Sequence, residues 1–422
     1  MQCGRRRTGC YPLLLAILVL GLAACGAAPR RQGPVTGLPG YRPRHEPRDY
    51  GPTEVFEPER LELTFTGDIM AHRVISSMSS FGDIYDGVRH TLRGDDLSFA
   101  NLEFPVDPTR PYAGYPRFNV HPEFVVAAIE GGFDVFSLAN NHSTDHGPSA
   151  IAETRRALRE LAERHGIRFS GLREAAGDPI AVETIRRGDW SIAFLAVTLF
   201  VNDPSRGVEL VQHVDLRRPA SRQELEARVR RAAGEHDAVV VSVHGGLEYR
   251  LRPDALKQAF FRDLVEAGAT VVWGHHPHVL QPFFSHDRGR GVILSSTGNF
   301  ISGQLRFLGP NDHAQPRAAT GDVALYRVTL VRDGDGSAAT PGGAAPSTGR
   351  RARVARVLPE FAGTVALPDG GYAVYPLDVL SSRRAGRDPA AAEAVAAEPP
   401  PLSPAWREFY AARRRALSGV TP

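Results

Sequence analysis

The hydrophobic residues of this chain recur in short runs rich in valine, leucine and phenylalanine, and a polar motif follows most of them. Runs of this composition are typical of buried strands, whereas apolar positions at helical spacing predict helices. The expected strands cover residues 61–66, 96–100, 133–139, 238–243, 271–273, 291–296, 323–331 and 353–365. The expected helices cover residues 123–130, 148–165, 221–233, 253–267 and 404–417. This alternation predicts an α/β fold with a functional site at the strand ends.

Turn and cap residues add detail to the pattern. Residues 180–198 predict a hairpin around Gly188-Asp189. Ser221 to Glu224 has the sequence of a capping box, which predicts that a helix begins there. Gly166 predicts the C-terminal cap of the helix that precedes it.

Composition divides the chain into four segments. Residues 1–24 have the features of a lipoprotein signal peptide, and residues 25–58 are rich in Pro, Arg and Gly without periodicity, which predicts a disordered tether. Residues 59–380 carry most of the expected strands and helices and form one domain, with a low-complexity loop at 332–351. Residues 381–422 form an Ala-, Pro- and Arg-rich tail with at most one helix.

The N-terminus predicts attachment to a bacterial envelope. A basic start and an apolar stretch too short to span a bilayer comfortably precede Leu22-Ala23-Ala24-Cys25. Small residues directly before a cysteine resemble a lipobox, so we expect an extracytoplasmic lipoprotein that is attached to the membrane through lipidated Cys25. The alternatives are an uncleaved short anchor and an ordinary signal peptide. Residue 26 is Gly rather than the Asp of inner-membrane retention, so in a two-membrane bacterium we expect the outer membrane.

Composition also excludes some classes of function. The chain has 422 residues and 42% hydrophobic content, enough for a large core. Its net charge of +3 argues against a dedicated nucleic-acid binder, so we expect no nucleic-acid partner. Cleavage before Cys25 would remove Cys3 and Cys10, and the mature chain would then have no second cysteine for a disulfide.

Three histidines follow the expected strand 271–273 within a few residues. In an extended backbone His276 and His278 point to the same side, because they are two residues apart. Paired imidazoles aimed at one point suit zinc, manganese or iron. The alternative is a solvated histidine-rich turn. His275 competes with His276 for the first position of the pair, and the strand spacing to His278 favours His276.

Other polar residues follow their own apolar runs and extend this candidate metal site. The expected ligands are Asp68, Glu103, Asn141, His244, His276 and His278. They would bind one or two divalent ions, and Asp68 would be the bridge if there are two. We expect His142 to act as a general acid or transition-state stabiliser, Asp145 to orient a histidine, and Arg73 to bind an anionic oxygen. For each residue alone, a turn, a cap, an ion pair or a satisfied buried histidine is the simpler explanation. The whole set, each member behind its own strand, favours a site.

These stretches resemble the CapA family, which is named for poly-γ-glutamate capsule synthesis. The resemblance covers roughly residues 60 to 305 and rests on six ordered motifs, TGDIM at 66–70, NLE at 101–103, ANNH with Asp145 and Gly147 at 139–147, SVHGGLEY at 242–249, GHHPHVLQP at 274–282 and STGNF at 296–300. It implies a calcineurin-like metallophosphoesterase fold, a four-layer β-sandwich flanked by helices. It also implies that the candidate ligands and His142 fall on motifs that bear metal and catalysis.

Two departures from the family pattern bear on the metal site. Met70 stands where the first metallophosphoesterase motif usually has histidine, so one ion is weakly held or lost, or His72 substitutes. Gly245 stands where the family often has tryptophan, which predicts a wider pocket.

The resemblance implies a function in synthesis, export or anchoring of an anionic capsule polymer such as poly-γ-glutamate. The expected chemistry is metal-dependent hydrolysis or transfer at a phosphoester or amide, and the expected partners are the polymer or a phosphoester, the membrane and membrane synthase subunits. Two alternatives stay open at this point. One is a non-catalytic accessory subunit of a synthase, and the other is a general extracytoplasmic metallophosphoesterase.

Overall fold

The computed structural model describes residues 60–286, 290–305, 307–332, 351–382 and 399–417. The predictions for the leader, Cys25, the tether and nearly all of the loop at 332–351 lie outside the described residues. No helix in the described ranges is both long enough and apolar enough for a bilayer span.

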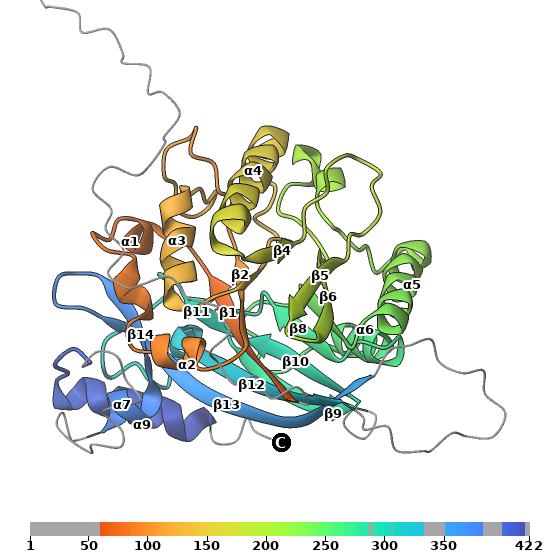
Figure 1. Ribbon diagram of the computed structural model, residues 1–422. Helices are drawn as coiled ribbons and strands as arrows, with labels where there is room; N and C mark the ends of the chain where they lie inside the picture. Colours follow the sequence, from red (N-terminus) through yellow and green to blue (C-terminus); the bar gives the residue numbers. More distant parts are fainter. Residues whose placement is uncertain (1–59, 287–289, 306, 333–350, 383–398, 418–422) are drawn as a thin grey trace, which may run out of the picture. The chain divides into compact units, whose positions relative to one another are not determined.

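Two mixed sheets form the centre of the fold (Figure 1). The first has the strand order β14-β13-β12-β1-β2-β3-β4, and β11 pairs with the carboxyl end of β1 on the side opposite β2. Its strands are β1 (Arg60–Ile69), β2 (Leu97–Leu102), β3 (Val135–Ser137), β4 (Arg168–Ser170), β11 (Asn299–Ile301), β12 (Asp322–Arg332), β13 (Ala352–Ala366) and β14 (Tyr372–Pro376). Strands β1 to β4 run parallel, so their carboxyl ends meet at one edge of the sheet.

The second sheet has the order β5-β6-β7-β8-β10-β9. Its strands are β5 (Glu183–Arg187), β6 (Trp190–Thr198), β7 (Ala238–His244), β8 (Val271–His275), β9 (Leu280–His286) and β10 (Gly291–Thr297). Strands β6, β7, β8 and β10 run parallel, whereas the edge strands β5 and β9 pair antiparallel with their neighbours.

Helices connect the strands and cover the outer faces of the sheets. The α-helices are α1 (Arg73–Ser76), α2 (Arg89–Arg93), α3 (Pro122–Gly131), α4 (Gly147–His165), α5 (Pro219–Glu235), α6 (Ala255–Glu266), α7 (Leu377–Ser381) and α9 (Pro404–Leu417). Short 3₁₀ turns occupy Gly82–Tyr85, Pro204–Arg206, Val208–Leu210 and Pro316–Gly321.

Three hydrophobic clusters lie between successive layers. One lies between the two sheets and includes Phe65, Phe194 and Trp273. A second packs the outer face of the first sheet against helices such as α3 and α4, and a third packs the outer face of the second sheet against α5 and α6. Three interlayer cores define four layers, helix, sheet, sheet and helix, so the predicted four-layer sandwich flanked by helices is confirmed.

Successive side chains of a buried strand alternate between the two faces of its sheet, so one strand contributes to two hydrophobic clusters. In β7, Val240 faces the cluster between the sheets, whereas Val239 and Val241 face the helical layer. Successive side chains of a strand point to opposite faces, and both faces here are covered, so the strand reads as one continuous apolar run.

Hydrogen bonds join the two sheets near the carboxyl ends of their strands. The indole of Trp273 donates to the carbonyl oxygen of Thr66 at 2.9 Å, and the Thr297 hydroxyl donates to the same oxygen at 2.6 Å. The Ser242 hydroxyl bonds that of Ser137 at 2.9 Å. These contacts hold the strand ends of both sheets in register with each other, although the space between the sheets is otherwise largely apolar.

Most expected elements are present, with shifted ends. The hairpin is confirmed by the pairing of Arg187 with Trp190, and Gly166 caps α4 with a left-handed φ of 73°. The prediction that a capping box begins the helix at Ser221 is wrong. Helix α5 begins at Pro219, whose fixed φ suits a first turn, and the Ser221 hydroxyl instead accepts a hydrogen bond from the backbone N–H of Asp215.

The terminal helix expected near residues 404–417 is confirmed as α9, and it is part of the domain core. Figure 1 shows α9 next to α7 at β13. Phe409 and Tyr410 are buried in the cluster between the sheets, and the Tyr410 hydroxyl donates to the carbonyl oxygen of Thr364 at 2.8 Å. Arg413 forms an ion pair with the buried Asp322.

Truncating Phe409 tests whether α9 stabilises the domain. We expect Phe409→Ala to lower the free energy of unfolding by about 3–5 kcal/mol, because it removes a buried ring and leaves a cavity. Denaturant unfolding followed by fluorescence measures this loss. Arg415→Ala, on the exposed face of the same helix, is the control and should change stability by less than about 0.5 kcal/mol. Equal effects of the two substitutions would contradict the packing role of α9.

Candidate metal centre

The candidate ligands come together at the carboxyl ends of strands from both sheets. Asp68 lies near the end of β1, Glu103 directly follows β2, and His244 ends β7. His276 and His278 follow β8. All five side chains are buried, although they begin far apart in the sequence. The sandwich therefore places carboxylates from the first sheet opposite imidazoles from the second.

Close packing at β1 fixes the position of Asp68. A Cβ at Gly67 would lie 2.2 Å from the carbonyl oxygen of Gly298, so only glycine allows β11 to come this close to β1. The resulting register pairs Asp68 with Asn299 on one side and with Asn101 on the other.

Two overlapping groups of side chains could each hold a metal ion. One group is Glu103, His276 and His278, and the other is Asp68, Glu103 and His244. In each group the ligand atoms all lie within 4.8 Å of one another. Glu103 is the member common to both groups, whereas the sequence predicts Asp68 as the bridge.

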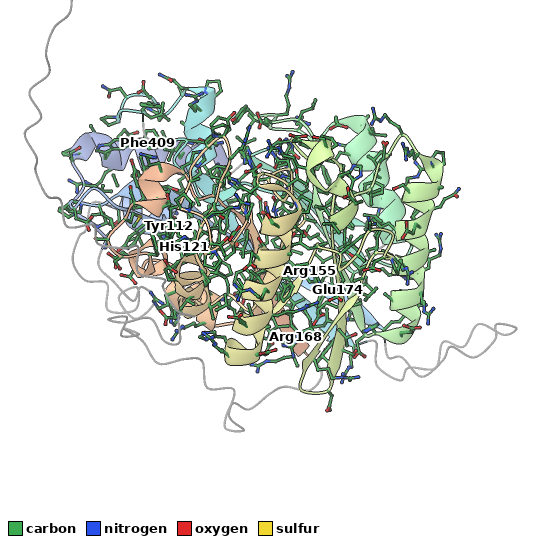
Figure 2. The ribbon with its side chains drawn as sticks, turned by 90° about the horizontal axis from the view of Figure 1, so that it is seen from above. Tyr112, His121, Arg155, Arg168, Glu174 and Phe409 are labelled. Atoms are coloured by element: carbon green, nitrogen blue, oxygen red, sulfur yellow. The ribbon has the colours of Figure 1, made fainter. Side chains whose placement is uncertain are left out.

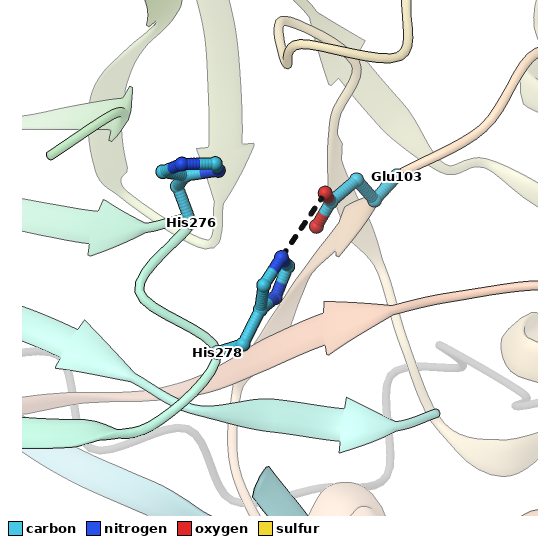
Figure 3. Close-up of side chains that lie close together, drawn as sticks. All are labelled: Glu103, His276 and His278. Carbon is cyan, nitrogen blue, oxygen red and sulfur yellow. Dashed lines mark ion pairs between the residues drawn. The ribbon is translucent and has the colours of Figure 1, made fainter. Parts of the chain in front are cut away.

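The distances around Glu103 suit a carboxylate that is shared by two ions. Its Oε1 lies 3.8 Å from Nε2 of His278 and 3.8 Å from Nε2 of His244. Neighbouring ligand atoms of a tetrahedral zinc ion are about 3.3–3.5 Å apart. Figure 3 shows Glu103 and His278 pointing toward each other, with His276 beside them.

Glu103 has two buried oxygens with no hydrogen-bond partner among the described residues. Burial raises the pKa of Glu103 well above its ordinary value, and the negative charge of Asp68 raises it further. A buried carboxylate without a donor or cation is costly, and an ion between the two groups would remove that cost. The residues therefore fit a divalent cation.

The surrounding imidazoles are in the state that metals bind. Burial lowers the pKa of His276 to about 3 and the pKa of His244 well below its ordinary value. Both rings are therefore neutral at pH 7, with lone pairs available for a metal. Carboxylate and imidazole donors suit zinc, manganese or iron, and the donor set does not distinguish among them.

The histidine pair reaches this geometry by a route other than the predicted one. His276 and His278 have φ values of 90° and 57°, so the backbone is left-handed at both and not extended. Their ring centroids are 5.5 Å apart. Left-handed conformations are uncommon for residues other than glycine and cluster at functional sites, where the surrounding structure enforces them. Here the backbone N–H of His276 donates to Oδ2 of Asp68 at 3.3 Å.

Asparagines and a further histidine orient the ligands, and the sequence analysis did not assign them roles in the site. Asn101 donates to Oδ1 of Asp68 at 2.8 Å, and Oδ1 of Asn299 bonds Nδ1 of His278 at 2.9 Å. His275 lies with Nδ1 3.1 Å from Oδ1 of Asp68. Burial alone raises the pKa of Asp68, but the close approach of His275 and His278 to its carboxylate outweighs burial and holds this pKa well below its ordinary value. Asn101 and Asn299 stand in the quoted NLE and TGNF motifs, so their place after a strand was the available signal.

The adjacent asparagines of the third motif have different roles. Oδ1 of Asn141 lies 2.8 Å from Nε2 of His244, which places Asn141 beside the second group. Asn140 shapes the turn, because its amide donates to the carbonyl oxygen of Leu102 and its Oδ1 accepts from the backbone N–H of His142.

His142 and Asp145 form a buried pair next to the cluster. Nδ1 of His142 lies 2.8 Å from Oδ2 of Asp145, which also accepts the backbone N–H of Phe118 at 2.8 Å. The Phe118 ring packs edge-on against His142 with centroids 4.6 Å apart. The carboxylate therefore fixes the ring orientation of His142, and a part of this pair in catalysis stays a prediction.

Arg73 and the two residues that depart from the family pattern, Met70 and Gly245, lie outside this cluster. Arg73 begins α1, is exposed and forms no ion pair with the described residues, so its role stays a prediction. The Met70 side chain is buried in the core beside the first sheet, and the His72 ring packs against Phe118 at 5.2 Å between centroids. Neither belongs to the two metal groups. A Cβ at Gly245 would lie 2.7 Å from Leu199, so the space beside this glycine is filled and the structure gives no widened pocket there.

Comparison with known proteins supports the sequence resemblance. Residues 62–304 match the family model described as "Bacterial capsule synthesis protein PGA_cap". "Capsule biosynthesis protein CapA" of Bacillus anthracis is 29% identical over 60% of this chain and 62% of its own length. "PGA biosynthesis protein CapA" of Bacillus subtilis is 26% identical over 67% of this chain and 71% of its own. The chain thus spans about three fifths of the first of these relatives.

Similarity to solved structures is weaker. A hypothetical protein from Thermus thermophilus is 19% identical, with a TM-score of 0.40 over 71% of this chain and 98% of that chain. A putative 5'-nucleotidase from Staphylococcus aureus is 13% identical, with a TM-score of 0.40 over 75% of this chain and 54% of that chain. The family assignment therefore rests on the sequence matches.

The unpaired carboxylate of Glu103 predicts an unusual mutational result. Because its pKa is raised in the folded protein, the ionised form costs stability at neutral pH, and this cost disappears as the pH falls. In chelator-treated protein, Glu103→Gln should raise the melting temperature at pH 7 by about 2 °C or more, measured by calorimetry. The same variant should lose most of the stabilisation that added zinc or manganese gives the wild type.

Glu360→Gln is the matched control for this experiment. Burial also raises the pKa of Glu360, but this residue bonds Thr91 and lies outside both metal groups. The control should keep its response to metal. A lower melting temperature for metal-free Glu103→Gln would contradict the conclusion that this carboxylate is unpaired.

Proposed function

The chain belongs to the bacterial capsule synthesis protein PGA_cap family, and on that basis we propose that it acts in the synthesis, export or anchoring of an anionic capsule polymer of the poly-γ-glutamate type. Two relatives named for capsule and PGA biosynthesis support the polymer class. The enzymatic part of the proposal is a metal-dependent hydrolase that acts on a phosphoester or amide bond. Its partners are the polymer or a phosphoester substrate and membrane synthase subunits.

The convergence of two ligand groups on the unpaired carboxylate of Glu103 is the observation that carries the enzymatic proposal. Glu103, His276 and His278 would hold one divalent ion. Asp68 and His244, with Asn141 beside them, would hold a second ion that shares Glu103. Such ions supply positive charge that stabilises the transition state and lower the pKa of a neighbouring water molecule.

The residues beside the ions supply proton transfer. Asp145 accepts a hydrogen bond from the N–H at Nδ1 of His142. Nε2 is therefore the ring atom left to exchange a proton with the substrate. We assign His142 as the general acid that protonates the leaving group. Oδ1 of Asn202 accepts a hydrogen bond from the Asn141 amide at 3.1 Å, and Nδ2 of Asn202 lies 3.4 Å from Nδ1 of His142, so Asn202 lies between the acid and the ligand groups.

The remaining parts of the proposal concern anions and the membrane. Arg73 at the start of α1 would bind an anionic oxygen of the substrate through its planar fork. Lipidated Cys25 would attach the protein to the extracytoplasmic face of a membrane, the outer membrane where there are two. The tether at 25–58 would keep the domain within reach of polymer at that surface.

Asp145→Asn tests the acid assignment. We expect this variant to bind metal like the wild type but to lose about 10²–10⁴-fold in kcat on an activated phosphodiester, because asparagine no longer fixes the proton on Nδ1 of His142. Metal content by elemental analysis and steady-state kinetics on the full-length protein measure the two effects. Asp203→Asn, an exposed cap of a nearby turn, is the control and should retain activity.

Metal analysis of the full-length wild type tests the broader assignment. Two equivalents of transition metal would support the paired site, and one would support a site reduced to a single ion. If reconstitution with zinc, manganese and iron gives no bound metal, the hydrolase proposal fails. A non-catalytic subunit that binds polymer or synthase would then be the better explanation.

Lipidation predicts a separate result in cells. A bacterial host that is fed an alkyne-labelled fatty acid should label the wild-type protein, and Cys25→Ala should lose the label and leave the membrane fraction. Cys10→Ala is the control, because Cys10 precedes the expected cleavage site. Label that persists in Cys25→Ala would contradict the lipoprotein assignment.

A further inference from the structure

A second candidate binding site lies away from the metal centre, where the edge strands of the two sheets meet. Strand β4 is the edge of the first sheet and β5 is an edge of the second. Residues of both strands and of helix α4 line a cavity of about 300 Å³. We call it the α4–β4 pocket. Edge strands often carry charged side chains that prevent pairing with other chains, but a cavity of this size requires a further explanation.

Three arginines line the α4–β4 pocket. Arg155 and Arg159 are one helical turn apart on α4, and Arg168 is the first residue of β4. Figure 2 shows Arg155 on α4 close to Glu174, with Arg168 further along the same side. A guanidinium presents a planar set of donors that matches a carboxylate, so neighbouring arginines in a concave wall favour oxyanions.

Glu174 already occupies the position that a bound carboxylate would take. It lies beyond the end of β4 and forms ion pairs with both Arg155 and Arg159. Its side chain is 66% exposed. The Arg159–Glu174 pair is exposed on both sides and contributes little to stability. The Arg155 side chain is only 13% exposed, and an external carboxylate that displaces Glu174 would keep its guanidinium paired.

The charged residues that line the pocket include three arginines but only two glutamates. Arg168 approaches the pocket's other glutamate, Glu183, with its Nε 3.4 Å from Oε1. Burial raises the pKa of Glu183, and burial followed by the charge of Arg159 lowers the pKa of Arg155. Positive charge crowded into a half-buried wall is relieved by an anion.

The pocket is lined by β4, the strand next to the one whose carboxyl end leads into the metal centre. Strand β4 pairs in parallel with β3, and the chain after β3 carries Asn141 and His142. Adjacent strands are about 4.8 Å apart, so the carboxyl ends of β3 and β4 are neighbours. An extended ligand that follows this edge can contact both regions.

We propose that the α4–β4 pocket binds a carboxylate side group of an acidic, polyglutamate-like polymer, which displaces Glu174 from Arg155 and Arg159. The polymer class rests on the proposed function, whereas the preference for an oxyanion rests on the arginines and Glu174 alone. The pocket thus serves as an anchoring subsite for a chain that passes the metal centre.

Binding of a short γ-linked glutamate oligomer to the full-length protein tests this proposal. Titration calorimetry at low ionic strength should show that a double Arg155→Gln, Arg159→Gln variant binds about tenfold more weakly than the wild type, because two charge-assisted contacts are lost. Glu174→Gln should bind about threefold or more tightly, since it removes the internal competitor. Arg156→Gln is the matched control, because Arg156 pairs with Glu153 and Glu160 on α4 and does not line the pocket.

The outcomes separate this proposal from its rivals. Unchanged affinity in the double variant, or weaker binding by Glu174→Gln, would overturn the pocket as the binding site. A second titration uses inorganic phosphate as the probe, and arginine-dependent binding of phosphate without binding of the oligomer would overturn the carboxylate polymer as the occupant. Repeating the oligomer titration with Glu103→Gln separates the sites. Retained binding with lost metal and activity would leave the pocket standing even if the hydrolase proposal fails.

Discussion

The contact between two buried carboxylates and the buried imidazoles that face them is the constraint on which the rest of this structure depends. Asp68 accepts hydrogen bonds from the Asn101 amide and from the backbone N–H of His276, whereas both oxygens of Glu103 lack a donor among the described residues. Such an arrangement is unfavourable in a dry interior unless a cation completes it. The cross-sheet bonds to the Thr66 carbonyl oxygen and the close approach of β11 to β1 at Gly67 hold the carboxylates and imidazoles together despite this cost.

The fold was largely predictable from the sequence because its two central sheets are covered on both faces. Buried parallel strands such as β7 and β8 read as continuous apolar runs that a sequence pattern detects well. Short strands such as β4 and β11 were missed, since three residues carry too little pattern. The start of α5 was misplaced because Ser221 to Glu224 has the sequence of a capping box, whereas the helix begins at Pro219 and the Ser221 hydroxyl accepts from the nearby backbone N–H of Asp215.

The candidate site was predictable in membership but not in geometry. Residues that follow apolar strands gave Asp68, Glu103, His244 and the histidine pair, and the structure brings them together. The left-handed backbone at His276 and His278 was not predictable, because spacing arguments assume regular strands. The supporting role of His275 was not predictable either. Which carboxylate is shared by both groups depends on the packing of two sheets, and a single sequence does not encode that in any local signal.

The pairing of β1 with β11 has a consequence for how the protein is made. Asp68 pairs with Asn299, and Asn299 in turn holds His278, so the centre is closed by contacts between the beginning and the end of the matched region. Contacts of such long sequence separation form late, because loop closure must precede them. While the chain is being synthesised from its N-terminus, the strands that carry the carboxylates emerge well before the imidazoles that face them. A chain that stops before β11 would lack Asn299, the partner of both Asp68 and His278, so the geometry of this cluster is complete only when the last strand of the matched region is in place.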